Sequence, residues 1–244
     1  MKKIIYHILC FTLSFSCWGC HDKENSSVLP IVKPEAIGTM FDKEGNEYTW
    51  VRYNGLDWMT SNLKCGKPFY KLAHNGVYVV YLDNKDQALA EYDSLGNLFS
   101  YEEAIANAPE GWRLPTDEDW KKLERTLGMS ATEADALGWR GSIEGELIQQ
   151  DANGSGICLL LSGIVSLQER TWTKYPYFCQ VREFGYYWTS TIDESYTLET
   201  TAYYRRTGFY TSQIERNVTA IQEKSTDGVI YNKYLSVRYV RDAQ

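Results

Sequence analysis

The segment Glu110–Glu124, EGWRLPTDEDWKKLE, constrains the fold of this chain more than any other part of the sequence. Pro115 biases the residue before it away from helical dihedrals, so the stretch that leads into it must run extended. Thr116 offers a hydroxyl as a helix N-cap, and the three acidic residues after it favour the positive end of a helix dipole. An apolar stripe at three- and four-residue spacing predicts a helix that Gly128 ends. The stripe consists of Trp120, Leu123 and Leu127.

Local signals elsewhere predict short helices among many strands. Capping boxes begin at Ser100 and Ser130, and each opens a helical turn or more. The dipeptide Asn54-Gly55 is a strong hairpin signal between two apolar runs. Candidate strands in the second half of the chain cover residues 158–166, 186–192, 201–206 and 234–240. Two early helices with strands on both sides predict an α+β domain.

The N-terminus is typical of an exported protein. Lys2 and Lys3 precede an apolar run over residues 4–15, which is the layout of a signal peptide and is too short to span a bilayer. The run ends in SCWGC, which resembles a bacterial lipobox with Cys20 at the lipidated position. The two residues after Ser16 depart from the usual pattern, and a signal peptide cleaved elsewhere is the alternative. Acyl chains on Cys20 would hold the protein on a membrane.

The rest of the chain divides into a tether and one domain. Residues 21–37 are polar, carry two prolines and have no periodicity, so they predict a flexible tether. Residues 38–244 are long enough to bury one substantial core. Loss of residues 1–20 removes two of the 25 basic residues and none of the 32 acidic ones, which leaves a formal charge of about −9. A surface of that sign disfavours nucleic acid as a partner.

Four ordered blocks carry a family resemblance over residues 38–242. They are GNEYTWVRYNGLDWMTSNL, LFSYEEAIANAPEGWRLPTDEDWKKLE, YYWTST and YLSVRYVRD. The chain resembles the Fibrobacter succinogenes major paralogous domain of Bacteroidetes-type lipoproteins. That family is similar to the C-type-lectin-like superfamily, which includes the formylglycine-generating enzymes. The resemblance implies a twisted antiparallel sheet whose first and last strands pair, with two main helices and long loops on one side.

Several kinds of chemistry have little support in the sequence. The formylglycine-generating enzymes depend on a late cysteine pair, and this chain has no cysteine after Cys179. The sequence contains no Gly-x-Ser-x-Gly motif, and His74 lies in a polar turn without an evident nucleophile. The run DANGSG from Asp151 resembles the start of a calcium loop, but Ser162 stands where a bidentate glutamate is needed. We therefore predict a non-catalytic protein without a cofactor or metal.

Three cysteines remain besides Cys20. Cys158 and Cys179 flank a candidate hairpin, and a disulfide between them would stabilise the fold by roughly 3 kcal/mol. Free thiols at both positions, and at Cys65, are the alternative.

Aromatic residues provide the remaining functional signal. The chain has 19 Tyr, 8 Trp and 8 Phe, and such rings stack on sugars and anchor protein interfaces. Most lie in the four blocks and predict core packing. The excursion over residues 169–184, ERTWTKYPYFCQVREF, combines aromatics with charges and lacks a period of two. We predict its aromatics as ligand-binding residues: Trp172, Tyr175, Tyr177 and Phe178. A loop that covers its own apolar cluster is the alternative.

The run Tyr203-Tyr204-Arg205-Arg206 is a second candidate, with an exposed strand as its alternative. Together these observations predict a lipid-anchored protein of the outer membrane or cell surface. Its domain would bind a glycan or an envelope protein. A structural or assembly role in the envelope is the alternative hypothesis.

Overall fold

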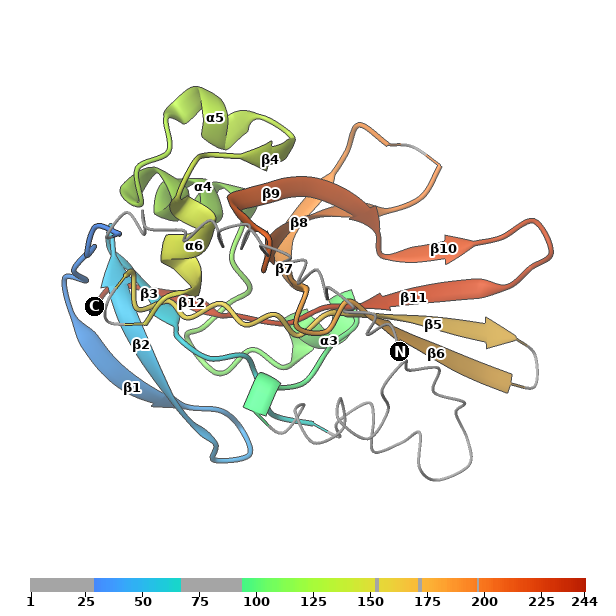
Figure 1. Ribbon diagram of the computed structural model, residues 1–244. Coiled ribbons are helices and arrows are strands. Elements are labelled where there is room, and N and C mark those ends of the chain that lie inside the picture. Colours follow the sequence, from blue (N-terminus) through green and yellow to red (C-terminus); the bar gives the residue numbers. More distant parts are fainter. Residues whose placement is uncertain (1–28, 67–93, 152–153, 171–172, 197) are drawn as a thin grey trace, which may run out of the picture.

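The computed structural model describes residues 29–66, 94–151, 154–170, 173–196 and 198–244, with the side chains of 170–178 outside that description. Within these residues the protein is mostly β, with three antiparallel sheets and four short helices (Figure 1). Strands make up 40% of the described residues and helices 16%. The predicted α+β, C-type-lectin-like fold with two main helices is therefore wrong.

Each sheet has four strands. The first has the order β1-β2-β3-β12, formed by Ile37–Phe41, Glu47–Tyr53, Leu56–Met59 and Val240–Asp242. The second has the order β10-β11-β5-β6, formed by Gln222–Lys224, Ile230–Tyr234, Ile164–Arg170 and Thr173–Cys179. The third has the order β4-β9-β8-β7, formed by Gly138–Arg140, Thr211–Ala220, Thr201–Gly208 and Phe184–Asp193. The helices are α3 (Tyr101–Ala106), α4 (Asp117–Thr126), α5 (Ala131–Asp135) and α6 (Glu144–Gln149).

The helices begin where the sequence predicts but stay short. Capping boxes are present at Ser100 and Ser130, as predicted, and the predicted N-cap Thr116 also forms one, with Asp119. A capping box satisfies the first N–H groups of a helix and does not set its length. Even α4 has only 10 residues, because Gly128 follows it with a φ of +127°. Strands, not helices, therefore supply most of the regular structure.

The predicted hairpin at Asn54-Gly55 is confirmed. Both residues have positive φ, 49° and 73°, as a two-residue hairpin turn of this kind requires. Tyr53 pairs with Leu56 across the turn. The predicted last strand over 234–240 is wrong, because β11 ends at Tyr234 and β12 begins at Val240. Strand β12 pairs with β3, so the expected pairing of first and last strands is also wrong.

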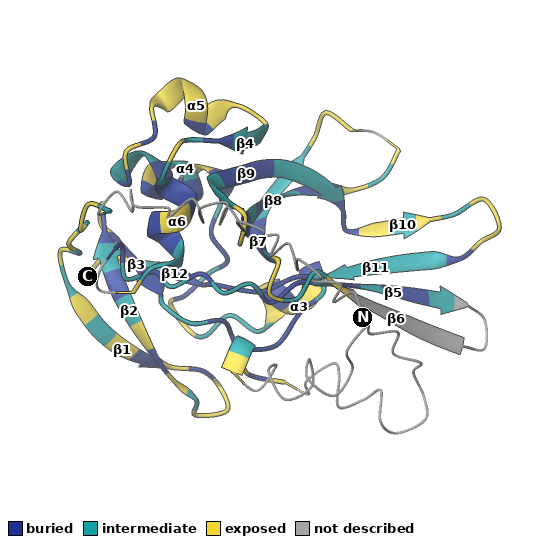
Figure 2. Cartoon of the chain, viewed as in Figure 1, coloured by how far each residue is buried: buried dark blue, intermediate teal, exposed yellow. Residues whose placement is uncertain are grey.

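Two apolar cores lie on opposite faces of β7. Tyr186 and Trp188 belong to one core, and Tyr187 between them belongs to the other. Trp120 of α4 packs in the second core, edge-on against Trp58 with ring centroids 4.9 Å apart. Figure 2 shows buried residues on α4, β7 and β9 and exposed ones on β10. The predicted stripe of α4 thus faces the sheets and positions the helix on them.

The described part of the predicted tether, residues 29–36, is held against the domain. The Val32 amide donates a hydrogen bond to the Gly154 carbonyl at 3.0 Å, and the Glu35 amide donates to the Arg52 carbonyl at 2.9 Å. Residues 1–28, which include Cys20, lie outside the described residues. In the described ranges, no helix combines the length and apolarity that crossing a bilayer requires.

Candidate functional site

The β4-β9-β8-β7 sheet places the second candidate run on two different faces. Alternation along β8 puts Arg205 on the face toward α4 and Tyr204 and Arg206 on the other face. Arg205 is fully buried, with 0% of its surface exposed. The four residues Tyr203 to Arg206 therefore do not form one site, and each face has its own chemistry.

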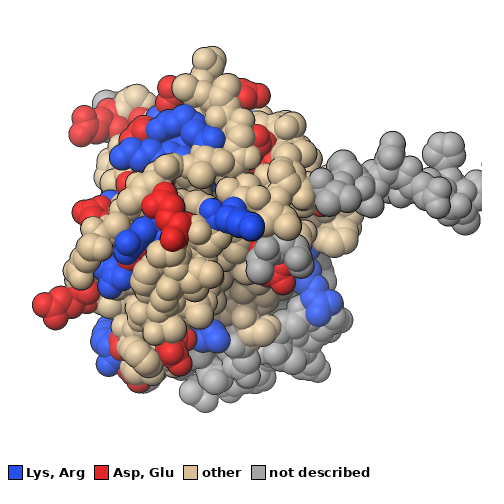
Figure 3. Space-filling model, turned by 90° about the vertical axis from the view of Figure 1, so that its left-hand side faces the viewer, with Lys and Arg blue, Asp and Glu red and all other residues tan. Residues whose placement is uncertain are grey.

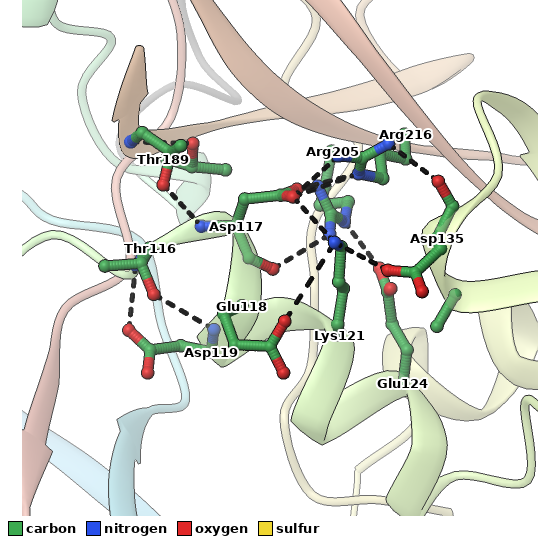
Figure 4. Close-up of polar contacts among 12 residues, drawn as sticks. Thr116, Asp117, Glu118, Asp119, Lys121, Glu124, Asp135, Thr189, Arg205 and Arg216 are labelled. Carbon is green, nitrogen blue, oxygen red and sulfur yellow. Dashed lines mark hydrogen bonds and ion pairs between the residues drawn. The ribbon is translucent and has the colours of Figure 1, made fainter. Parts of the chain in front are cut away.

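The face toward α4 carries a buried network of ion pairs (Figure 4). Arg205 donates to the Asp117 carboxylate at 2.7 Å and to the Glu124 carboxylate at 2.5 Å. Arg216 of β9 also donates to Asp117, at 2.7 Å, and Arg140 of β4 makes two 3.0 Å bonds to Glu124. Bidentate arginine–carboxylate pairs are among the strongest polar contacts in proteins. The network joins α4 to three strands of the sheet.

The rim of the network is more exposed and mixed in charge. Lys121 lies 2.7 Å from Asp135 and 3.4 Å from Asp117. Arg125 pairs with Glu118 at 2.9 Å. Figure 3 shows acidic side chains beside the basic ones on this side of the molecule. Exposed pairs of this kind contribute little to stability compared with the buried network.

The three acids after Thr116 have structural roles. Asp119 accepts a hydrogen bond from the Thr116 amide at 2.8 Å, which completes the capping box. Burial alone would raise the pKa of Asp117, but hydrogen bonds from Arg216 and the charge of Arg205 outweigh it and hold that pKa well below its usual range. Burial also opposes the ionised form of Glu124, yet the charges of Arg205 and Arg140 lower its pKa. These carboxylates are held as anions that stabilise the fold.

We expect the stability of the protein to fall steeply below about pH 4. The folded-state pKa values of Asp117 and Glu124 lie below the unfolded-state values, which are near 3.9 and 4.3. The stability that these two carboxylates contribute is therefore fully present above the unfolded-state pKa values. It is lost as the pH falls through the folded-state pKa values. For Asp117 this contribution is on the order of 2 kcal/mol. Urea unfolding at pH 6, 4 and 2.5 should show a smaller loss in Asp117→Asn than in the unmutated chain. The control Glu102→Gln, on the exposed face of α3, should keep the full loss; equal pH dependence of all three proteins would contradict the assignment.

The other face of the same sheet carries a row of aromatic rings, here called the aromatic strip. Successive ring centroids are 6.1, 6.4 and 5.9 Å apart. The row comes from strands β4, β7 and β8 and consists of Trp139, Phe184, Tyr186 and Tyr204. All but Tyr186 are partly exposed. The strip is therefore an aromatic surface that solvent can reach.

Polar groups are fixed within the aromatic strip. The Arg206 guanidinium lies 4.8 Å from the ring centroids of Trp139 and Phe184 and pairs with Glu215 of β9. It also donates to the Tyr186 hydroxyl at 3.1 Å. Burial raises the pKa of Tyr204, so its hydroxyl stays protonated and can donate a hydrogen bond. The arrangement combines ring faces with directional donors and acceptors on a rigid sheet.

A second feature is an apolar groove of about 730 Å³ beside α3. Its walls include Ile105, Ile192, Leu198 and Ile221, and Lys224 lies at its margin. Ile105 and Leu198 are both exposed. The groove offers an apolar contact surface that polar residues, among them Glu102 and Glu199, also line.

The predicted ligand-binding loop forms a hairpin. Strands β5 and β6 pair from Ile164↔Cys179 to Arg170↔Thr173, so most of the segment 169–184 is strand. The sequence did not indicate this, because its apolar and polar residues do not alternate with a period of two. Trp172 lies outside the described residues, as do the side chains of Tyr175, Tyr177 and Phe178. Binding by these four residues stays a prediction.

The thiols and the calcium-like run have ordinary structural surroundings. Cys65, Cys158 and Cys179 are free thiols, which is the alternative to the Cys158–Cys179 disulfide. Burial raises the pKa of Cys65 to about 11. The Ser155 hydroxyl donates to the Leu147 carbonyl at 2.9 Å, while residues 152 and 153 of the calcium-like run are not described. In the described parts of the chain, no group of three or more His, Cys, Asp or Glu side chains could hold a metal ion.

The fold and its sites define a mostly β domain with a buried ionic network on one sheet face and an aromatic strip on the other. The family model described as the Fibrobacter succinogenes major domain matches residues 51–241, and the chain belongs to that family. Neither a curated protein nor a solved structure matches the chain.

Proposed function

We propose that this protein is a lipid-anchored surface protein whose domain binds a glycan through the aromatic strip without catalysing a reaction. The anchor part of the proposal is supported by the signal-peptide pattern and by Cys20 in the lipobox-like SCWGC run. The binding part is supported by one observation above the others. A row of rings, three of them partly exposed and one, Tyr186, buried among them, lies around the Arg206–Glu215 pair.

This combination suits a sugar for a physical reason. The apolar C–H face of a sugar ring packs on an aromatic side chain, and its hydroxyls need donors and acceptors at fixed positions. Arg206 and Asn217, both partly exposed, provide donors, and the buried Glu215 carboxylate holds them in place by pairing with Arg206 and accepting from the Asn217 amide at 3.3 Å. A sheet holds these groups more rigidly than a loop would, which reduces the entropy lost on binding.

We expect Trp139→Ala and Tyr204→Ala each to weaken glycan binding by about tenfold or more, as truncation of an aromatic anchor does at binding surfaces. The measurement is a glycan array followed by titration of the glycan that binds best. Tyr210→Ala is the matched control, because this tyrosine is 82% exposed in the β8–β9 turn and contacts the Phe209 ring. Thermal unfolding should confirm that the variants are folded. Unchanged glycan binding in both strip variants would contradict the proposal.

The same array tests the earlier prediction for the hairpin. If Trp172→Ala and Tyr177→Ala lose glycan binding while the strip variants keep it, the site lies on the β5–β6 hairpin and not on the aromatic strip.

The assembly alternative draws support from the apolar groove beside α3. Exposed apolar side chains such as Leu198 are typical of protein contacts. Cross-linking on intact cells would distinguish the two roles. One stoichiometric envelope protein as the partner, together with no glycan bound on the array, would favour assembly.

A further inference from the structure

Among the described residues, strand β1 is a sheet edge with no strand on its outer side. It is the first strand in the order β1-β2-β3-β12, and in Figure 1 it forms the outer edge of that sheet. Its sequence, IGTMF, contains no charge and no proline, although natural proteins usually place such residues on edges to prevent pairing. Ile37 and Phe41 are 70% and 58% exposed. An edge with these properties is suited to accept another strand.

The backbone of β1 has outward-facing hydrogen-bonding groups at alternate residues. The Ala36 carbonyl accepts from the Arg52 amide, and the Asp42 amide donates to the Asn46 carbonyl, so the even-numbered residues face β2. In an antiparallel ladder the residues between them face the other way. These are Ile37, Thr39 and Phe41. The Thr39 carbonyl also accepts from the Trp50 indole at 3.0 Å, which leaves its second lone pair for a partner.

We propose that β1 pairs antiparallel with β1 of a second copy of this chain, about a two-fold axis at Thr39. In this register Thr39 faces Thr39 of the second copy, and Ile37 faces Phe41 at both ends. Glu35 lies before β1 and Lys43 follows it, so the antiparallel pairing also brings opposite charges near each other at both ends. A strand that is complementary to itself in shape, apolarity and charge is the requirement for an isologous interface.

The self-complementary register is the reason for choosing a second copy as the occupant. An unrelated strand would have no reason to find both an apolar residue and an opposite charge at each end. The pairing would join two four-stranded sheets into one continuous sheet. One strand pair buries less surface than a standard stable interface, so the dimer should be weak and depend on concentration.

Cysteine cross-linking of the full-length chain in detergent tests the register. Facing residues of a hydrogen-bonded antiparallel pair have Cα atoms about 5.5 Å apart, which is within the range a disulfide can bridge. We expect Thr39→Cys to give a covalent dimer on mild oxidation. The unmutated chain, which keeps all its native cysteines, and the exposed Tyr210→Cys variant serve as controls. Equal dimer yields from Thr39→Cys and Tyr210→Cys would overturn the proposal, as would a cross-link from residue 39 to a different protein.

Charge reversal tests the same register by another route. In the Thr39→Cys background, Glu35→Lys or Lys43→Glu should lower the dimer yield roughly three- to tenfold, because symmetry places like charges at both ends. The double reversal should restore the yield, since it exchanges the two signs. Both side chains also contact their own chain, at the Asn54 amide and the Asn107 side chain, so unfolding curves check each variant. A double reversal that does not recover the dimer would also overturn the register.

Discussion

Replacement of Glu124 by leucine should lower the free energy of unfolding by about 3–5 kcal/mol. Glu124 is fully buried and accepts hydrogen bonds from two arginines, Arg140 and Arg205, which are also buried. Among the described residues, removing the carboxylate leaves Arg140 with the Ala134 carbonyl, at 2.7 Å, as its oxygen partner. A buried charge that has lost its counter-ion costs several kcal/mol, whereas the intact pair contributes far less.

Chemical denaturation at pH 7 measures this effect. The control Glu118→Gln lies on the same helix but is largely exposed and pairs with Arg125, so it should cost less than about 1 kcal/mol. The double variant Glu124→Leu with Arg140→Met should recover part of the loss, because removal of both partners leaves fewer unpaired charges. A loss below 1 kcal/mol in Glu124→Leu, or a double variant less stable than either single variant, would contradict this account.

The local parts of this fold could be predicted from the sequence. Three capping boxes and the Asn54-Gly55 turn each depend on contacts within four residues, and all are present in the structure. Such local signals do not specify how long a helix is or which strands pair in a sheet. The prediction of two main helices failed because each cap opens a helix of only 5 to 10 residues.

The sheet partners depend on long-range contacts that no local pattern specifies. Trp139 reaches the aromatic strip only because β4 pairs with β9, where it faces Glu215. The alternation of side chains along β7 and β8 was a usable signal for which residues share a face. In the register of the structure, Tyr186 lies opposite Arg206 and Trp188 lies opposite Tyr204. The adjacent pair Arg205 and Arg206 could not be assigned to two faces without knowing which face α4 covers.

Burial of charge was the least predictable feature. The sequence predicts that the acids after Thr116 stabilise the N-terminus of a helix. In the structure Asp119 has this role, because it accepts a hydrogen bond from the Thr116 amide. Asp117 instead pairs with arginines from β8 and β9. Two aspartates that lie two positions apart, Asp117 and Asp119, therefore have different roles, and only the sheet packed on α4 distinguishes them.

Replacement of Arg238 by methionine should be about as damaging as loss of Glu124, with a cost of roughly 3–5 kcal/mol. Arg238 is buried, and its guanidinium donates to four uncharged oxygens of the described residues. It donates to the Asn62 side chain at 2.7 Å and to the carbonyls of Met59, Ile157 and Cys158. Burial lowers the pKa of Arg238, which shows that this position opposes a charge.

The cost arises because one side chain satisfies four oxygens from two distant segments, 59–62 and 157–158. Methionine fills a similar volume but leaves those buried acceptors without a donor, and each unsatisfied group costs about 1–3 kcal/mol. Arg238→Lys should recover little, since a single ammonium cannot reproduce the planar fork of donors. Arg125→Met on the exposed side of α4 is the control and should cost less than about 1 kcal/mol. If Arg238→Lys were as stable as the unmutated chain in urea, charge alone would explain the role of Arg238 and the fork geometry would not.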